Sequence, residues 1–466
     1  SEKEENYKAI GAAAGLAYNQ IVGAESAVDI NLAKQLNVVT TQLGVDAKKI
    51  VMNIGSAAAG YGYEYVVSTM DRIKGAALGQ NDNMLQMPII TPVSAETWAV
   101  KEATASEADM PEWGSADERG IDMEVMTAAA DLAAGSDAVI LRHPESIKTI
   151  KIGTGDAEFT LGGETVLFRH EKTFVSKPRY AVSLCTCMDD AEVEAKLAEI
   201  PHVDYDRIGE RMHVELVYVN CDAEADAAKY TALVEKAKGL GRTLILGCTD
   251  PEIAKAALEV CKDGKPVLNG ANASNYEAMN TVATEAGVVL GVSGKDINEL
   301  YDTVAALEKL GNKNLVLDTT GADIKETFAN TVMVRRAALK DQDRTFGYPS
   351  IVNLVKLAKG DHHLQAALAS VFTMKYGSII VMEQMTYAEA LPLFGLRQNV
   401  YTDPQKPMKV EPGIYPLNGA DENSLVVTTV DFALTYFVVS GELERSGVPL
   451  NLVINDAGGL SVLTSW

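Results

Sequence analysis

Short apolar runs recur along residues 178–383, and a stretch with helical amphipathic spacing follows each of them. They are 180–185, 214–219, 243–247, 266–269, 288–292, 314–318, 350–354 and 378–382. Most of them lack the polar alternation of a strand with one solvent-facing side, so they indicate parallel strands covered on both faces. Eight such strand–helix units predict an α/β protein with an eight-stranded TIM-type barrel, and a doubly wound open sheet is the alternative.

Residues 1–146 contain four further apolar runs, and they repeat the second half of the barrel pattern. The pairs include Asp29-Ile30-Asn31 with Asp296-Ile297-Asn298, Gly44 with Gly311, Ala76-Ala77-Leu78 with Ala337-Ala338-Leu339, and Pro88 with Pro349. The matches keep their order along the chain, which favours an internal duplication over chance similarity. We therefore expect a half barrel whose two open edges face a partner or further protein.

Residues 1–146 match only the second half of a barrel. The absence of the matching first half leaves two interpretations of the chain. Either it is a natural fusion whose half barrel packs on a partner, or residues 1–146 and 147–466 belong to different polypeptides. The change of pattern favours the second, with a break near residues 146–150. The expected parts are a half barrel at 1–146, a β-hairpin and barrel at 147–397, and the first part of another α/β domain at 398–466, with strands at 424–430 and 448–454.

The net charge narrows the classes of partner. The chain has 41 Lys and Arg against 64 Asp and Glu, a net charge of −23, which argues against nucleic acid or anionic lipid as the main partner. No apolar run is long enough to span a bilayer, and the acidic N-terminus lacks the features of a secretory signal. The five cysteines form a sparse, odd set that fits a reducing compartment, so we expect a cytoplasmic protein.

Cysteine and histidine spacing predicts no metal site. Cys185 and Cys187 lie one residue apart on a predicted strand, so we expect one core thiol and one surface thiol. His362 and His363 follow Asp361 and precede an apolar helical pattern. This arrangement favours a helix with Asp361 near its N-cap over a pair of metal ligands.

The carboxyl ends of barrel strands are where barrel enzymes place their chemistry. The residues at these ends are Asn269, Ser293, Asp318, Asn353 and Glu383. They form no nucleophile–base set, and polar residues also cap strand ends for structural reasons, so both interpretations stay open. We assign no catalytic residue, and the sequence leaves open whether the chain is itself an enzyme.

Two segments have unusual composition. Small residues at 55–62 permit close approach of the backbone to a ligand or a neighbouring protein, although tight helix–strand packing explains them equally well. Residues 428–436 combine small and hydroxyl side chains with two aromatics. Such a surface suits a large flat cofactor, and packing of a strand on a helix is the alternative.

Longer motifs resemble one known family. Residues 153–156, 162–174, 401–408, 413–416 and 434–442 resemble the large (gamma) subunit of the corrinoid iron–sulfur protein, which belongs to the acetyl-CoA synthase/CO dehydrogenase (Wood–Ljungdahl) system. Residues 29–37, 60–65, 84–88, 113–114, 118–121 and 142–145 resemble the C-terminal half of its small (delta) subunit. The resemblance implies that 398–466 is part of a flavodoxin-like corrinoid domain.

The resemblance implies a methyl carrier that uses a corrinoid, a cobalt-containing cobamide. Reduced cobalt would accept a methyl group from a methyltetrahydropterin, through a separate methyltransferase, and deliver it to the nickel site of acetyl-CoA synthase. The implied partners are the other subunit of the corrinoid iron–sulfur heterodimer, that methyltransferase, and acetyl-CoA synthase/CO dehydrogenase. The family's large subunit also holds a four-iron–four-sulfur cluster, but this chain lacks the four-cysteine segment, so we expect no cluster ligands in it.

The same resemblance assigns cofactor contacts. They are Thr402, Met408, Phe432, Ala433, Leu434 and Thr435, with Thr435 near the lower face of the corrin. No D-x-H-x-x-G motif is present, so no histidine is expected to bind cobalt from below. The alternative function is a pterin-binding barrel methyltransferase, which predicts a cluster of acidic or Asn residues inside one complete barrel.

Overall fold

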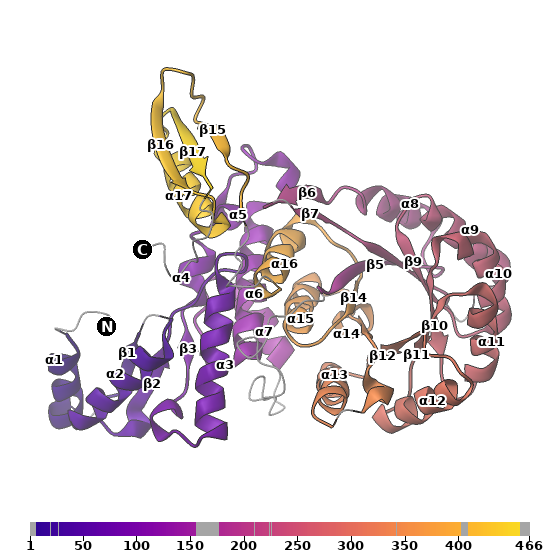
Figure 1. The fold of residues 1–466 in the computed structure, drawn as a ribbon, viewed down its shortest axis with the longest axis horizontal. Helices are drawn as coiled ribbons and strands as arrows, with labels where there is room; N and C mark the ends of the chain where they lie inside the picture. Colours follow the sequence, from indigo (N-terminus) through magenta and orange to yellow (C-terminus); the bar gives the residue numbers. More distant parts are fainter. Residues whose placement is uncertain are drawn as a thin grey trace.

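A closed barrel of eight parallel strands dominates the computed structural model, at the right of Figure 1. The structure describes residues 6–18, 20–26, 28–154, 177–208, 210–222, 224, 226–341, 343–401 and 409–456. The barrel strands are β5 (Arg179–Cys185), β8 (Leu216–Asn220), β9 (Thr243–Gly247), β10 (Val267–Ala271), β11 (Val289–Val292), β12 (Leu315–Asp318), β13 (Ser350–Asn353) and β14 (Ile379–Met382). β14 pairs with β5 and closes the sheet, with Ile380 opposite Tyr180. The predicted eight-stranded barrel is confirmed.

Helices cover the outside of the barrel, and aspartate side chains start many of them. These helices are α8 (Asp190–Glu199), α9 (Ala227–Lys238), α10 (Pro251–Cys261), α11 (Tyr276–Ala286), α12 (Ile297–Lys309), α13 (Ile324–Leu339), α15 (His362–Met374) and α16 (Tyr387–Val400). Asp250, Asp296 and Asp361 accept hydrogen bonds from backbone N–H groups that the first turn leaves unpaired. The N-cap predicted at Asp361 is confirmed, and its carboxylate lies 3.0 Å from the Leu364 nitrogen.

An antiparallel hairpin between α8 and β8 was not predicted. Its strands are β6 (Asp204–Arg207) and β7 (Glu210–His213). Three of the four residues of β6 are charged, so the strand carries no apolar run in the sequence. Tyr205 anchors the hairpin on α16, where its ring centroid lies 5.7 Å from that of Tyr387 and 6.3 Å from that of Phe394.

The N-terminal segment forms an open row of short parallel strands. β1 (Val22–Glu25) pairs with β2 (Ile50–Asn53), and β3 (Ile90–Thr91) pairs with β4 (Ala138–Val139). A bridge between Met52 and Ile89 joins the two pairs. The helices of this segment include α2 (Ile30–Gln42), α3 (Tyr63–Gly79), α4 (Val93–Thr97), α5 (Lys101–Thr104) and α6 (Ala116–Ala134). We call residues 6–143 the half barrel.

Helix α6 joins the half barrel to the complete barrel, and it packs against α15 and α16 (Figure 1). Most of its residues are buried, because both parts of the protein cover it. The loop at 55–62 also reaches α16. A Cβ atom added to Gly395 of α16 would lie 2.9 Å from the Cα of Gly60, so the small residues of this loop permit a close backbone contact with the neighbouring barrel.

The segment where a break was expected is helical. Residues Pro144–Thr154 form one helix, α7, which also packs on α15 and α6. The structure thus has a continuous helix where the sequence favoured a change of polypeptide at 146–150. The helix also occupies the start of the expected hairpin, at Lys151 to Thr154, and the rest of that hairpin lies outside the described residues.

A small sheet with one helix projects from the junction of the two parts, at the top of Figure 1. Its strands are β15 (Gly413–Leu417), β16 (Leu425–Val430) and β17 (Leu450–Asn455), in the order β15-β17-β16. β16 and β17 are parallel, and α17 (Ala433–Arg445) connects them. The strands predicted at 424–430 and 448–454 are confirmed. No helix in the described part of the chain is long and apolar enough to cross a bilayer.

Candidate functional site

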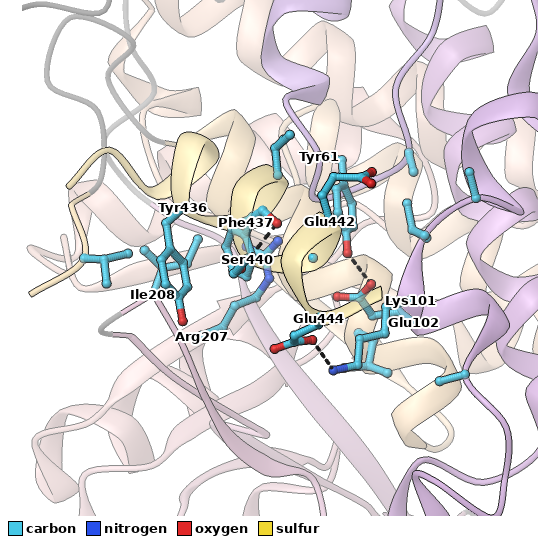
Figure 2. A pocket seen from close by; sticks show the side chains of 18 of the residues that line it. Tyr61, Lys101, Glu102, Arg207, Ile208, Tyr436, Phe437, Ser440, Glu442 and Glu444 are labelled. Atoms are coloured by element: carbon cyan, nitrogen blue, oxygen red, sulfur yellow. Dashed lines mark hydrogen bonds and ion pairs between the residues drawn. The ribbon is translucent and has the colours of Figure 1, made fainter. Parts of the chain in front are cut away.

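A cleft of about 1060 Å³ lies where the half barrel, the β6–β7 hairpin and α17 meet (Figure 2). The half barrel contributes Tyr61 and helix α5, and the hairpin contributes Arg207. The opposite wall consists of α17 and β15. Three segments far apart in the sequence therefore form one site.

Aromatic side chains form the wall on the side of α17. The ring centroid of Tyr436 lies 5.5 Å from that of Tyr415 and 5.9 Å from that of Phe437. The guanidinium of Arg207 lies 5.1 Å from the Phe437 ring centroid, in a cation–π contact across the cleft. These rings offer flat apolar surface with one positive charge beside it.

Gly441, in the middle of α17, presents no side chain to the cleft. It lines the cleft, and a Cβ atom added there would meet nothing within 4 Å. Glycine inside a helix costs about 0.5–1 kcal/mol of stability relative to alanine. A glycine at this position thus carries a cost to the helix while leaving open space beside the aromatic wall.

The half barrel supplies the polar side of the cleft. The Tyr61 hydroxyl donates a hydrogen bond to Glu102, with 2.5 Å between the oxygens. Burial and the negative charge of Glu102 raise the pKa of Tyr61 well above its usual value, although Arg207 and Arg445 oppose the shift. Tyr61 therefore stays protonated and acts as a hydrogen-bond donor.

Arg207 of the β6–β7 hairpin forms hydrogen bonds with the loop at 55–62 and with helix α16. It donates to the carbonyl oxygen of Gly60 at 2.8 Å and to the side chain of Gln398 on α16.

An ion pair joins the two walls of the cleft, between Lys101 of α5 and Glu444 of α17 at 3.3 Å. Both of these side chains are about half exposed, so the ion pair is weak and opens at little cost.

The predicted cofactor contacts that the structure describes lie at the start of α17, directly before the residues that line the cleft. Phe432 is the N-cap of α17 and Ala433 its first residue, and both are buried, while Thr435 is partly exposed. Leu434 lies in the same helix, and its side chain is outside what the structure describes. Thr402 and Met408 are outside the described residues.

None of the described predicted contacts lines the cleft, which begins one residue further along, at Tyr436. Lys409, the next residue in the chain after Met408, does line the cleft. Phe437 lay within the motif at 434–442 and could have been found there, whereas Arg207 lies in the hairpin that no apolar run predicts.

Two of the five predicted strand-end residues meet inside the barrel. The Asn269 amide donates to Asp318 at 3.0 Å and to the Tyr218 hydroxyl at 3.4 Å. The amide oxygen of Asn269 would lie 2.2 Å from a Cβ atom on Gly291, so this side chain is packed tightly on the next strand. Ser293 donates to the Ala271 carbonyl, Asn353 accepts from the Val355 nitrogen, and the Glu383 carbonyl accepts from Lys196.

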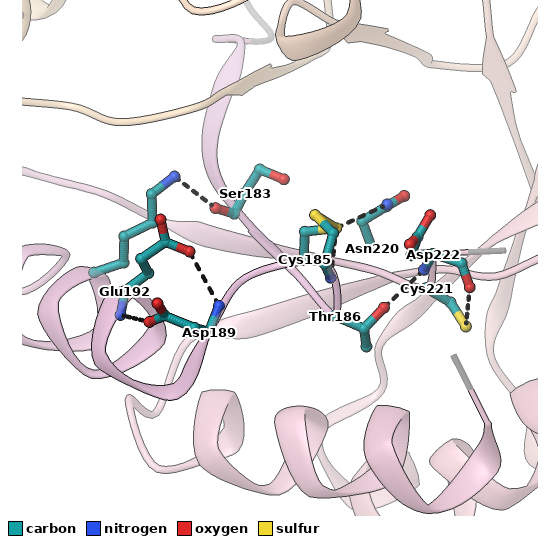
Figure 3. Close-up of a disulfide and its surroundings, with 10 residues drawn as sticks. Ser183, Cys185, Thr186, Asp189, Glu192, Asn220, Cys221 and Asp222 are labelled. Carbon is teal, nitrogen blue, oxygen red and sulfur yellow. Dashed lines mark hydrogen bonds between the residues drawn. A yellow bond between two sulfur atoms is a disulfide. The ribbon is translucent and has the colours of Figure 1, made fainter. Parts of the chain in front are cut away.

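Cys185 and Cys187 form a disulfide, so the expectation of two thiols is wrong (Figure 3). The expected difference in exposure does hold, since Cys185 is buried and Cys187 exposed. Strand β5 ends at Cys185 and the chain turns, which brings the Cys187 sulfur back over the strand end. Among the described residues, no group of three or more His, Cys, Asp or Glu side chains could hold a metal ion.

Comparison with known proteins identifies the family. The model of the CO dehydrogenase/acetyl-CoA synthase delta subunit family matches residues 1–141 and 149–466. The chain belongs to that family. The two matched stretches cover both the half barrel and the complete barrel, and the match agrees with the family resemblance found in the sequence.

Individual relatives agree with this assignment. The corrinoid/iron–sulfur protein large subunit of Moorella thermoacetica is 35% identical over 320 residues, which cover 69% of this chain and 71% of that protein. The acetyl-CoA decarbonylase/synthase complex subunit gamma of Methanopyrus kandleri is 34% identical over 329 residues, 68% of this chain and 70% of that protein. Among solved structures, dihydropteroate synthase from Thermus thermophilus with 4-aminobenzoate aligns with a TM-score of 0.34 and 16% identity, over 48% of this chain and 95% of that one.

Proposed function

We propose that the chain is a cytoplasmic methyl carrier that holds a corrinoid between α17 and the half barrel. Family membership supports the cofactor, because a relative 35% identical to the chain is named a corrinoid/iron–sulfur protein. The observation that carries the proposal is the cleft. The helix that begins at the predicted corrinoid contacts continues directly as its aromatic wall.

The cleft fits a corrinoid in size and chemistry. Its volume of about 1060 Å³ is at the upper end for small-molecule sites, as a ligand with a broad macrocycle requires. The rings of Tyr436 and Phe437 and the open surface at Gly441 suit a flat ring. Arg207 and Ser440 line the cleft and would meet amide groups such as those at the edge of a corrin.

The chain's own residues would bind and orient the cofactor. When bound, the corrinoid supplies the cobalt that takes up and releases the methyl group. Tyr61, held by its hydrogen bond to Glu102, would contribute its ring and its oxygen to the half-barrel wall, and the aromatic wall would exclude water from one side. The Lys101–Glu444 ion pair joins the walls weakly, so its opening would admit a partner protein to the cleft.

The partners follow from the same proposal. A methyl carrier meets a donor enzyme and an acceptor enzyme in turn, which we take to be a methyltetrahydropterin methyltransferase and the nickel site of acetyl-CoA synthase/CO dehydrogenase. The other subunit of a corrinoid iron–sulfur heterodimer is the third partner. The relatives' names support these assignments, since one of them is a subunit of an acetyl-CoA decarbonylase/synthase complex.

A second candidate is the pterin-binding barrel methyltransferase, which the Asn269–Asp318 cluster favours. The cluster lies inside a complete barrel, and no described residue forms a hydrogen bond with the Asn269 amide oxygen. Against it, Asp318 is already paired with Asn269 and with the Thr320 nitrogen, and the Asn269 amide packs directly against the backbone of Gly291. Direct binding of a tetrahydropterin to the protein, lost in Asp318→Ala, would favour this candidate.

The proposal is tested by cobalt content and visible absorption of the full-length protein after reconstitution with a corrinoid. Gly441→Leu fills the open surface of the cleft and should lower bound cobalt at least about tenfold, since each 1.4 kcal/mol of lost binding is tenfold. Tyr276→Ala, on barrel helix α11, is the control and should leave it unchanged. Full cobalt binding by Gly441→Leu, or no corrinoid absorption in the unmutated protein, would overturn the proposal.

A further inference from the structure

The Cys185–Cys187 disulfide at the carboxyl end of β5 contributes little to stability. It joins residues two apart, so it closes a minimal loop and hardly restricts the unfolded chain. Cys221, Cys248 and Cys261 form no disulfide. The other cysteines of the protein are thiols, and this disulfide has little structural effect, so we expect it to have a chemical role. We infer that Cys185–Cys187 is a thiol–disulfide exchange site whose substrate is a dithiol reductant.

The two sulfur atoms are not equivalent. Cys187 is exposed, whereas 9% of Cys185 is exposed, so a thiolate from solution reaches Cys187. The Cys185 sulfur accepts hydrogen bonds from the Cys187 nitrogen at 3.1 Å and from the Asn220 amide at 3.5 Å (Figure 3). Donors aimed at a sulfur stabilise its thiolate, and a stabilised thiolate leaves faster. Cys187 is thus the attacked atom and Cys185 the leaving group.

The exchange proceeds in two balanced steps. The thiolate of the reductant attacks the Cys187 sulfur, the new S–S bond forms, and the Cys185–Cys187 bond breaks with its electron pair going to Cys185. The second thiolate of the reductant then attacks its own bonded sulfur and releases Cys187 as a thiolate. The reductant leaves as a cyclic disulfide, and two electrons have passed to the pair, which takes up protons from water.

The surrounding hydrogen bonds hold the turn whether or not the disulfide is intact. Thr186 donates through its backbone nitrogen to the Asn220 carbonyl at 3.1 Å, and its hydroxyl accepts from the Asp222 nitrogen at 2.8 Å. Cys185 is paired with Asn220 in the β5–β8 ladder. These contacts keep the Cys185 sulfur beside the Asn220 amide after reduction.

Neighbouring thiols provide an internal control. Cys221 and Cys248 directly follow β8 and β9, at the same end of the barrel. Burial raises the pKa of Cys221, and it raises the pKa of Cys248 to about 12. Their sulfurs donate to the carbonyls of Asp222 and Asp250. These thiols are therefore poor nucleophiles and should not take part in the exchange.

The test uses the full-length chain, treated with increasing dithiothreitol and then alkylated. Trypsin releases Cys185 and Cys187 together on the peptide 180–196, without another cysteine. We expect this peptide to be unlabelled without reductant and to gain two alkyl groups at dithiothreitol concentrations that leave Cys221 labelling unchanged. Alkylation of the peptide without reductant, or resistance of its disulfide to excess dithiothreitol in the native protein, would overturn the inference.

A separate experiment tests which sulfur is attacked and which one leaves. Glutathione has one thiol, so it should leave a mixed disulfide on Cys187 with Cys185 free to be alkylated. Asn220→Ala removes one donor and should slow reduction by about threefold without moving the adduct, whereas Cys221→Ser should leave the rate unchanged. An adduct on Cys185, or an unchanged rate in Asn220→Ala, would refute the roles assigned to the two sulfurs.

Discussion

Gly60 and Gly395 bring the backbone of the half barrel into direct contact with helix α16 of the barrel, and a Cβ atom on Gly395 would lie 2.9 Å from the Cα of Gly60. The neighbour at this distance is backbone, which cannot move aside as a flexible side chain would. The contact therefore sets how the two parts of the protein are positioned, and the position of the loop at 55–62 in turn sets the position of Tyr61 in the cleft.

We predict that Gly395→Val destabilises the protein by about 2 kcal/mol, because overpacking a close contact typically costs 1–3 kcal/mol. Gly79→Ala is the control: it lies at the end of helix α3, where an added Cβ would meet nothing within 4 Å, and should change the stability little. The measurement is urea unfolding of both variants. Equal midpoints for Gly395→Val and the unmutated protein would show that the contact is not tight.

Arg397 and Arg179 contact the same carboxylate from different environments. The Glu215 carboxylate lies 2.8 Å from Arg397 and 2.9 Å from Arg179, whose side chains are 1% and 56% exposed. Removing Arg397 breaks the buried ion pair and the hydrogen bond from Arg397 to the Pro178 carbonyl, and it leaves Glu215 with the exposed Arg179 and the Tyr180 nitrogen as partners. Arg397→Met should therefore cost about 3 kcal/mol or more, and Arg179→Met less than about 1 kcal/mol. Similar losses in thermal or urea unfolding would contradict this difference.

Buried acids at the junction of the two parts make the stability depend on pH. Burial raises the pKa of Glu389 on α16 to about 8, and that of Asp131 on α6 to about 7. A hydrogen bond to the Asp122 carboxylate raises the pKa of His363. At pH values between about 5 and 8 the folded protein therefore binds more protons than the unfolded chain, so the free energy of unfolding must fall as the pH rises.

Glu389→Gln removes one titrating group, so the folded and unfolded states of the variant differ less in the number of protons that they bind. We predict that the free energy of unfolding of the variant falls less steeply between pH 5 and pH 8, by up to about 1.4 kcal/mol per pH unit for a full proton. Glu411→Gln, an exposed position in the C-terminal segment, should leave the slope unchanged. The measurement is urea unfolding at several pH values, and a rise of stability with pH in the unmutated protein would contradict the argument.

The barrel was predictable because its signals are local. Buried parallel strands are apolar throughout, and helix starts such as Asp250-Pro251 are marked within a few residues. The β6–β7 hairpin was not predictable, since three of the four residues of β6 are charged and its Tyr205 packs on a helix far along the chain. The cleft depends on how that hairpin, the half barrel and α17 meet, which no short stretch of sequence encodes.

Substitutions of Thr435 test how the corrinoid contacts α17. The resemblance places it near the lower face of the corrin, and the chain has no D-x-H-x-x-G motif to supply a histidine there. Thr435 is partly exposed in the first turn of α17, directly before the aromatic wall. A hydroxyl that only packs and makes weak polar contacts can be lost, so Thr435→Ala should keep most of the bound corrinoid and most of the methyl transfer.

A bulky side chain at the same position should act differently. Thr435→Trp would obstruct the lower face, and we expect bound cobalt to fall at least about tenfold, equivalent to 1.4 kcal/mol of binding. Cobalt content and the methylation rate of the reconstituted full-length protein measure both variants. Loss of corrinoid in Thr435→Ala would show that the hydroxyl is a required contact. A spectrum with a nitrogen ligand on cobalt in the unmutated protein would show that another group occupies the lower face, because the α17 surface at Thr435 offers no such donor.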